Sequence, residues 1–196
     1  MGDGRRLFEE DRAHEPPPLP LLVACESGDI NRARQLLQSG ADVNLREAQG
    51  WSPLIMAAKE GHEELLRELL AAGASPNPPD VSHTPLRGAA IFGRDGCIRL
   101  LLDAAADPNH CSAGRRTPLM GASMSGHEST VALLLAAGAD PSVTNDFGES
   151  AGDLASAKGH GGCAKQLESA AARDVARKAS HHAFAVSEAT AAGSQD

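Results

Sequence analysis

A short segment of the sequence returns at a nearly constant interval, and this repetition limits the fold more than any other feature. The segment Ser52-Pro53-Leu54 reappears as Thr84-Pro85-Leu86 and as Thr117-Pro118-Leu119, so that the prolines are 32 and 33 residues apart. One unit of this length is too small to cover its own apolar side chains, and neighbouring units must stack to share a core. We therefore expect a solenoid of stacked units.

Two weaker copies flank these three. The first begins at Pro20-Leu21, and the last begins at Ser150-Ala151 and keeps Gly159-His160. Five repeats that start near residues 20, 53, 85, 118 and 151 give a predicted repeat domain over residues 20–170.

The two ends of the chain differ from the repeats. Residues 1–19 contain Pro16-Pro17-Pro18 and are predicted as a flexible proline-rich arm, with a ligand for an SH3-like domain as the alternative. Residues 171–196 are predicted as an alanine-rich helix or a disordered tail.

Each unit carries the signals of two short helices separated by a turn. A Ser or Thr before each proline is placed to cap the first helix, and the proline occupies the first helical position, where its missing N–H is harmless. A glycine near the end of that segment is suited to stop the helix in a left-handed conformation. These glycines are Gly61, Gly93 and Gly126.

The second helix of each unit has one apolar face, because its aliphatic side chains recur at three- to four-residue spacing. Aromatic residues make up only 3% of the chain, with no Tyr and one Trp, so the core must be aliphatic, which favours helices over sheets. The predicted buried residues of the second helices are Leu36, Leu37, Leu66, Leu69, Leu70, Ile98, Leu101, Leu102, Val131, Leu134 and Leu135. The predicted fold class is all-α.

The period, the Thr-Pro-Leu helix start, the Gly-His turn and the Leu-Leu-x-x-Gly-Ala ending together resemble the ankyrin repeat. The resemblance implies an ankyrin-repeat solenoid of L-shaped helix-turn-helix units, whose hairpin loops project sideways and form a concave surface with the first helices. Ankyrin arrays are nearly always protein-binding modules. Two departures from the family pattern stand out. The His that usually follows Thr-Pro-Leu is replaced by Ile55, Arg87, Met120 and Asp153, and Gly88 and Gly121 stand where a larger apolar residue is usual.

The same resemblance implies which residues face a partner, since the variable positions of ankyrin repeats lie before the Thr-Pro start and near the end of the first helix. Trp, Met and Arg are enriched at the energetic centres of interfaces. We expect Arg116 to pair with an acidic group of the partner. The alternative is that Trp51 and Phe92 only cover the backbone of the next hairpin. The predicted protein-binding residues are Trp51, His83, Ile91, Phe92, Arg116, Met124 and Phe147.

Two asparagines resemble the sites that asparaginyl hydroxylases accept in ankyrin repeats. Asn44 and Asn109 each follow an Asp by two residues and a Leu by eight residues. We predict hydroxylation at both. The alternative is that each Asn caps its hairpin turn.

Charge and cysteine content exclude several classes of function. The net charge of -8 argues against nucleic acid and anionic lipid, which need a basic surface. The four cysteines are far apart, which argues against a disulfide scaffold or a zinc site and favours the cytoplasm or nucleus. No apolar run is long enough for a membrane span or a signal peptide.

Groups that carry chemistry are sparse. His110 and Cys111 are neighbours on a hairpin, without the third group that would orient a base toward a thiol. His62, His127 and His160 recur at one position of the repeat, which favours a role at the start of the second helix over metal binding. We expect no cofactor, no metal and no enzymatic activity.

The function predicted from the sequence is therefore a protein-binding module, an adaptor or scaffold that is monomeric in isolation. The alternatives are a fixed structural subunit of a larger assembly and an inhibitor of a partner enzyme such as a kinase.

Overall fold

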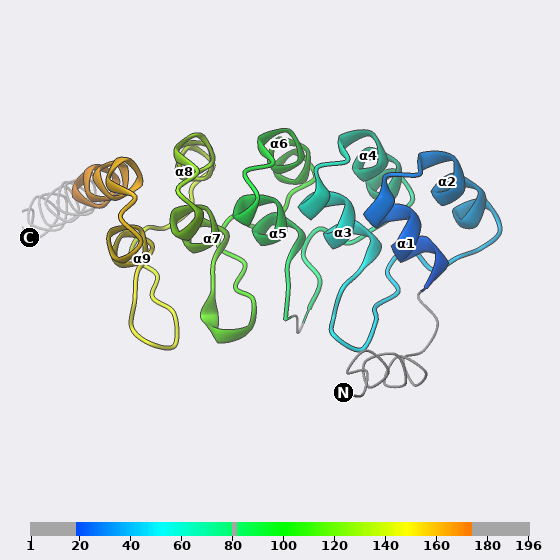
Figure 1. Ribbon diagram of the computed structural model, residues 1–196, viewed down its shortest axis with the longest axis horizontal. Helices are drawn as coiled ribbons and strands as arrows, with labels where there is room; N and C mark the ends of the chain where they lie inside the picture. The colour runs from blue at the N-terminus through cyan, green and yellow to red at the C-terminus, as the bar shows by residue number, and fades with distance from the viewer. Residues whose placement is uncertain (1–18, 80–81, 174–196) are drawn as a thin grey trace, which may run out of the picture.

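The computed structural model describes residues 19–79 and 82–173, and within these ranges it contains helices and two isolated bridges but no strand. Figure 1 shows two parallel rows of helices, with long loops that project from the row of first helices. The first helices are α1 (Pro20–Ser27), α3 (Pro53–Glu60), α5 (Pro85–Ile91), α7 (Pro118–Ser125) and α9 (Ala151–Ala157). The second helices are α2 (Ile30–Gln38), α4 (Glu63–Ala71), α6 (Asp95–Asp103), α8 (Glu128–Ala136) and a last helix over residues 161–173. The predicted all-α repeat solenoid is confirmed.

The starts of the first helices are capped as predicted. The backbone N–H of Arg87 donates to Thr84 Oγ1 at 3.2 Å, and Thr117 Oγ1 accepts from Met120 in the same way. In the fifth repeat, where proline is replaced by alanine, Ser150 and Asp153 form a reciprocal capping box. Local side-chain chemistry therefore sets where repeats two to five begin, whereas α1 starts after Leu19 without a side-chain cap.

The core runs through the whole stack, because each first helix packs against the next one along the row. Leu66, Leu69, Ile98, Leu101, Val131 and Leu134 are buried, as predicted. The prediction is wrong for the other five second-helix residues, which are only half-buried: Leu36, Leu37, Leu70, Leu102 and Leu135. In α4 the buried residues are Leu65, Leu66 and Leu69, and Leu70 points about 100° away from Leu69, which places it at the edge of this core face. Leu36 is half-buried for a further reason. Within the described chain, α2 has a neighbouring second helix on one side only.

The turn histidines connect each repeat to the one before it. His62 Nε2 donates to the carbonyl of Glu26 at 3.2 Å, and His160 Nε2 donates to that of Met124 at 3.1 Å. His127 does the same toward Ile91, and in the third repeat Arg94 Nε takes this role toward Lys59. These histidines stand at the N-cap position, as predicted from the sequence, but their side chains do not cap the helix.

The glycines that end the first helices make room for these side chains. A Cβ on Gly126 would lie 2.6 Å from His160 Nδ1, and one on Gly28 would lie 2.7 Å from His62 Cε1. Both glycines also have a positive φ. Glycine is therefore required at these turns for two reasons: the positive φ of the backbone, and the lack of space for a Cβ beside the histidine of the next repeat.

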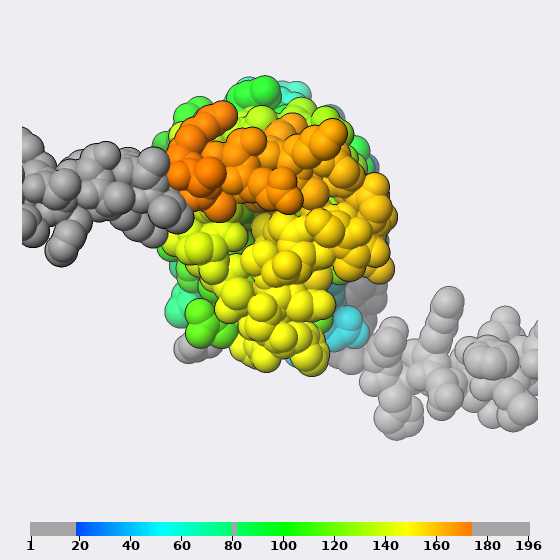
Figure 2. All heavy atoms as spheres, turned by 90° about the vertical axis from the view of Figure 1, so that its left-hand side faces the viewer, coloured from blue at the N-terminus to red at the C-terminus, as the bar shows by residue number. Residues whose placement is uncertain are grey.

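The stack ends at α9 and the last helix. Figure 2 views the array from this end, with the last helix lying across the top. Cys163 and Leu167 of this helix are buried against the core. The helix continues to residue 173, and the predictions for residues 1–18 and 174–196 lie outside the described residues.

Replacing Leu69 by Ala is expected to lower the free energy of unfolding by about 2 to 5 kcal/mol, because the side chain is fully buried and leaves a cavity. Leu70→Ala is the matched control, since the adjacent side chain is half-buried and should cost less. Urea unfolding followed by circular dichroism measures both. Equal losses in the two variants would contradict the assignment of the core face.

Candidate functional site

The candidate site lies where the hairpin loops join the first helices. Trp51, His83, Arg116 and Glu149 occupy equivalent positions in successive repeats, one residue before the N-cap. The hairpin fixes the backbone at three of these positions. The carbonyl of Trp51 accepts from Glu47 N, that of Arg116 accepts from Ser112 N, and that of Glu149 accepts from Asn145 N, at 2.9 to 3.1 Å. These side chains therefore form a row on a rigid base.

Two rings of this row stack across the boundary between repeats. The centroids of Trp51 and His83 are 4.1 Å apart, with an angle of 11° between the ring planes. Lys59 Nζ lies 5.6 Å from the Trp51 centroid and 5.7 Å from the Phe92 centroid, so that one ammonium group lies near both rings. We call Trp51, His83, Lys59 and Phe92 the aromatic–lysine cluster.

The lysine of this cluster is held in place. Lys59 Nζ pairs with Glu60 Oε1 at 2.9 Å. A Cβ added to Gly88 would lie 3.8 Å from Lys59 Cβ, so the lysine stem lies close to this glycine of α5. A Cβ at Gly88, one of the departures from the family pattern, would be in ordinary van der Waals contact with the stem.

The second such glycine lies one repeat later, beside Ile91. A Cβ on Gly121 would lie 3.0 Å from Ile91 Cγ1, which is tighter than ordinary contact. Ile91 is half-buried in the groove between α5 and α7. The side chain of Ile91, a predicted binding residue, therefore packs partly against the next repeat.

The remaining predicted residues are exposed but lie outside the cluster. Met124 is 38% exposed at the end of α7, and Phe147 is 78% exposed on the hairpin of the fifth repeat. Within the described residues, no ring contact joins Phe147 to the cluster. The structure thus brings together Trp51, His83 and Phe92, and it leaves Met124 and Phe147 as separate apolar side chains.

Arg87 is a residue of this face that the sequence analysis did not include. It follows Leu86 in α5 and is half-buried, and its Nε is buried without a hydrogen-bond partner. Burial, and then the charge of Arg116, lower the pKa of Arg87, while burial and Arg87 lower the pKa of His83. The sequence contains a signal for this residue. Arg87 is charged, whereas the residues at the same position of the neighbouring repeats, Ile55 and Met120, are apolar and fully buried.

The predicted hydroxylation sites join successive hairpins. Asn44 Nδ2 donates to the carbonyl of Gly73, and Asn44 Oδ1 accepts from Ser75 N at 2.9 Å. Asn109 makes the same pair of bonds to Gly138 and Asp140. The Asp side chains cap the turns instead, since Asp42 accepts from Asn44 N and Asp107 from Asn109 N.

Asn77 bridges in the same way between the hairpins of the third and fourth repeats, a role that the sequence analysis missed. Hydroxylation of Asn44 and Asn109 stays a prediction. Mass spectrometry after incubation with an asparaginyl hydroxylase would show an added oxygen at each.

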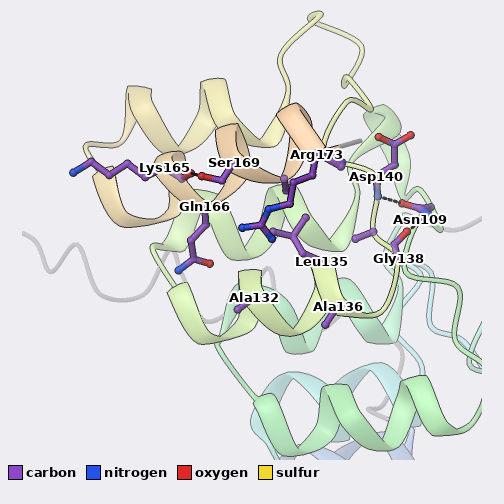
Figure 3. A pocket seen from close by; sticks show the side chains of 13 residues that line it. Asn109, Ala132, Leu135, Ala136, Gly138, Asp140, Lys165, Gln166, Ser169 and Arg173 are labelled. Atoms are coloured by element: carbon purple, nitrogen blue, oxygen red, sulfur yellow. Dashed lines mark hydrogen bonds between the residues drawn. The ribbon is translucent and has the colours of Figure 1, made fainter. Parts of the chain in front are cut away.

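A cavity of about 1020 Å³ opens away from this face, between α8 and the last helix. Figure 3 shows Ala132, Leu135 and Ala136 of α8 on one side, and Gln166 and Arg173 of the last helix on the other. Its lining is mixed, with small apolar residues of α8 facing polar and charged side chains that include Lys165, Gln166 and Arg173. Across residues 19–79 and 82–173, no three His, Cys, Asp or Glu side chains are placed to hold a metal ion.

The helices of this part of the chain are short. None of those described has both the length and the apolar character that a bilayer crossing requires.

The four cysteines are free, and only Cys111 is exposed. Burial raises the pKa of Cys25 to about 12 and that of Cys97 to about 11, and burial also raises the pKa of Cys163. The thiolate is the reactive form.

Iodoacetamide at pH 8 is therefore expected to modify Cys111 alone in the folded protein, and all four cysteines once the protein is unfolded. Mass spectrometry of tryptic peptides measures this. Rapid modification of Cys25 or Cys97 without denaturant would show that the core is not packed as described.

Comparison with known proteins places the array in a family. Residues 21–112 match the family model for ankyrin repeats in three copies, and residues 119–167 match that for ankyrin repeats in many copies. The chain is 37% identical over 121 residues to the ankyrin repeat, SAM and basic leucine zipper domain-containing protein 1 of Loxodonta africana, which covers 55% of this chain and 26% of that protein. It is 41% identical over 98 residues to the ankyrin repeat and SOCS box protein 16 of Mus musculus, covering 45% and 22% of the two chains. It is also 38% identical over 102 residues to the ankyrin repeat and KH domain-containing protein mask of Drosophila melanogaster, covering 48% and 2%.

The chain thus spans about a quarter or less of the length of these relatives. The matched segments are the repeats themselves, and together the two family models cover most of the described residues. With its stacked helix pairs, projecting hairpins and matching repeat models, this chain belongs to the ankyrin-repeat family.

Proposed function

We propose that this chain is an adaptor or scaffold that binds a partner protein through the hairpin and first-helix face of repeats two to four. Ankyrin repeats are generally protein–protein interaction modules. The observation that carries the proposal for this face is the aromatic–lysine cluster, which gathers the single Trp of the chain, a Phe, a His and a Lys from two adjacent repeats.

The exposure of apolar groups supports this face. Phe92 is 45% exposed and Met124 is 38% exposed, although both lie on well-packed repeats. Large apolar side chains that remain exposed on a packed array favour an interaction surface. Trp and Arg dominate the energetic centres of many interfaces.

The rigidity of the cluster also favours binding. Trp51 is fixed by its stack with His83 and by a backbone hydrogen bond across the hairpin, and Lys59 pairs with Glu60. Side chains that are already ordered lose little entropy on association. The partner therefore meets a preformed surface.

The names of the relatives combine ankyrin repeats with other domains such as SAM, KH and the SOCS box. This arrangement supports a role in which the repeats supply binding to a partner. A fixed subunit and an enzyme inhibitor would use the same face. The stoichiometry of the protein purified from its source separates them, since an adaptor is isolated free, as a monomer, as well as bound.

Trp51→Ala and Phe92→Ala are each expected to weaken binding by about 2 kcal/mol or more, because they remove apolar anchors from the cluster. Arg67→Ala is the matched control, since this side chain is exposed on a second helix and only loosely paired with Glu63. A partner isolated by affinity purification with the full chain is titrated against each variant by calorimetry.

Thermal melting of the variants separates binding from folding. The proposal requires reduced affinity at an unchanged melting temperature. Unchanged affinity in both variants would show that the cluster only covers the hairpins. A melting temperature that falls together with the affinity would show that these residues stabilise the core rather than bind the partner.

We also propose that the chain acts in the cytoplasm or the nucleus. The support is its four free cysteines, which suit a reducing compartment. Fractionation of the source cells with an antibody to the chain tests this, and recovery in a secreted fraction would contradict it.

A further inference from the structure

Arg87 has a guanidinium group that the free chain leaves unpaired. Its Nε is buried without a hydrogen-bond partner, and no ion pair to Arg87 or Arg116 exists within residues 19–79 and 82–173. We propose that Arg87 and Arg116 together bind a carboxylate of an acidic segment of the partner, with the Trp51–His83 stack beside it. This inference rests on the proposed function and names the chemistry of the partner.

The position of Arg87 follows from the stacking of the first helices. Its equivalents in the neighbouring repeats, Ile55 and Met120, are fully buried. Its stem passes close to Gly121, where a Cβ would lie 3.6 Å from Arg87 Cγ. The stem thus lies between α5 and α7, and Arg87 stands four residues after His83, which belongs to the same row as Arg116.

The influence of neighbouring charges agrees with this position. Arg116 lowers the pKa of Arg87, and Arg87 lowers that of His83, so Arg87 lies close to both. The lowered pKa of His83 favours its neutral ring. The positive charges of Arg87 and Arg116 thus act on each other, and the stacked rings of Trp51 and His83 stand in the same row as Arg116.

Nearby acids are engaged elsewhere. Glu60 pairs with Lys59, and Glu149, which follows Arg116 in the row, accepts from Asn145 Nδ2 of its own hairpin at 2.9 Å. A buried N–H without an acceptor is costly, as at Arg87 Nε, and two like charges in proximity increase the cost. An arriving carboxylate relieves both penalties and can accept two parallel hydrogen bonds from a guanidinium.

Charge favours an acidic peptide over other anions. The whole chain carries a net charge of -8, so a polyanion such as nucleic acid is repelled over most of the surface. A single Asp or Glu of a peptide can be bound by Arg87 and Arg116 alone, without a basic surface around them. The rings of Trp51 and His83 favour an aromatic or aliphatic residue next to that acid.

The experiment selects peptides from a random display library on the full-length protein. The expected consensus is an Asp or Glu next to an apolar residue. A labelled peptide of that consensus is then titrated by fluorescence anisotropy. Arg87→Met and Arg116→Gln are each expected to weaken it about 10- to 100-fold, since hydrogen bonds to charged groups are lost. Arg99→Gln, an exposed arginine on α6, is the control and should bind as wild type.

Two further measurements distinguish the outcomes. Arg87→Met should melt at or above the wild-type temperature, because it removes a buried Nε that has no hydrogen-bond partner, whereas loss of a purely structural arginine would lower the melting temperature. Loss of peptide binding in Trp51→Ala but not in the arginine variants would overturn this inference and leave the proposed face intact. Peptides without an acid would also overturn it, and peptides unaffected by every variant would overturn the proposed face itself.

Discussion

Stacking between repeats is the interaction on which the rest of this structure depends. A pair of eight- or nine-residue helices cannot cover its own apolar face, and each first helix here completes its core only against the next. The turns are adapted to the same contact, since His62, His127 and His160 each bond to the preceding repeat through space that a glycine leaves open. The half-buried state of Leu36 at the first repeat shows what is lost where a neighbour is missing.

The candidate site is a consequence of that stacking. Trp51 and His83 belong to different repeats, and their rings stack only because the hairpins are held in register. The register is fixed by the asparagine bridges from Asn44, Asn77 and Asn109 to the following hairpins. A binding face formed in this way is as rigid as the stack, although it consists mainly of loop residues.

The sequence was sufficient for features that depend on local chemistry. Each N-cap is decided by a residue and its neighbours along the chain, so the starts at Thr84 and Thr117 could be predicted without a structure. The period and the leucine spacing gave the all-α solenoid for the same reason. The error at Leu70 arose because spacing alone does not say which of two adjacent leucines points inward.

The features that the sequence could not provide are contacts between repeats. Nothing near His62 in sequence indicates its bond to Glu26, and nothing near Lys59 indicates that Phe92 lies beside its ammonium group. Arg87 was visible as a departure from the family pattern, but the burial of its Nε without a hydrogen-bond partner became apparent only in the structure. Predicting such sites from sequence requires the register of the stack, in addition to the identity of each repeat.

The central claim is that the hairpin and first-helix face of repeats two to four is where a partner binds. Hydrogen exchange of the backbone amides, measured with and without the purified partner, tests this most directly. Our account predicts slower exchange on binding in residues 47–60, 82–93 and 112–125, with little change in α2, α4, α6 and α8. Protection confined to the second helices, or to the cavity between α8 and the last helix, would contradict it.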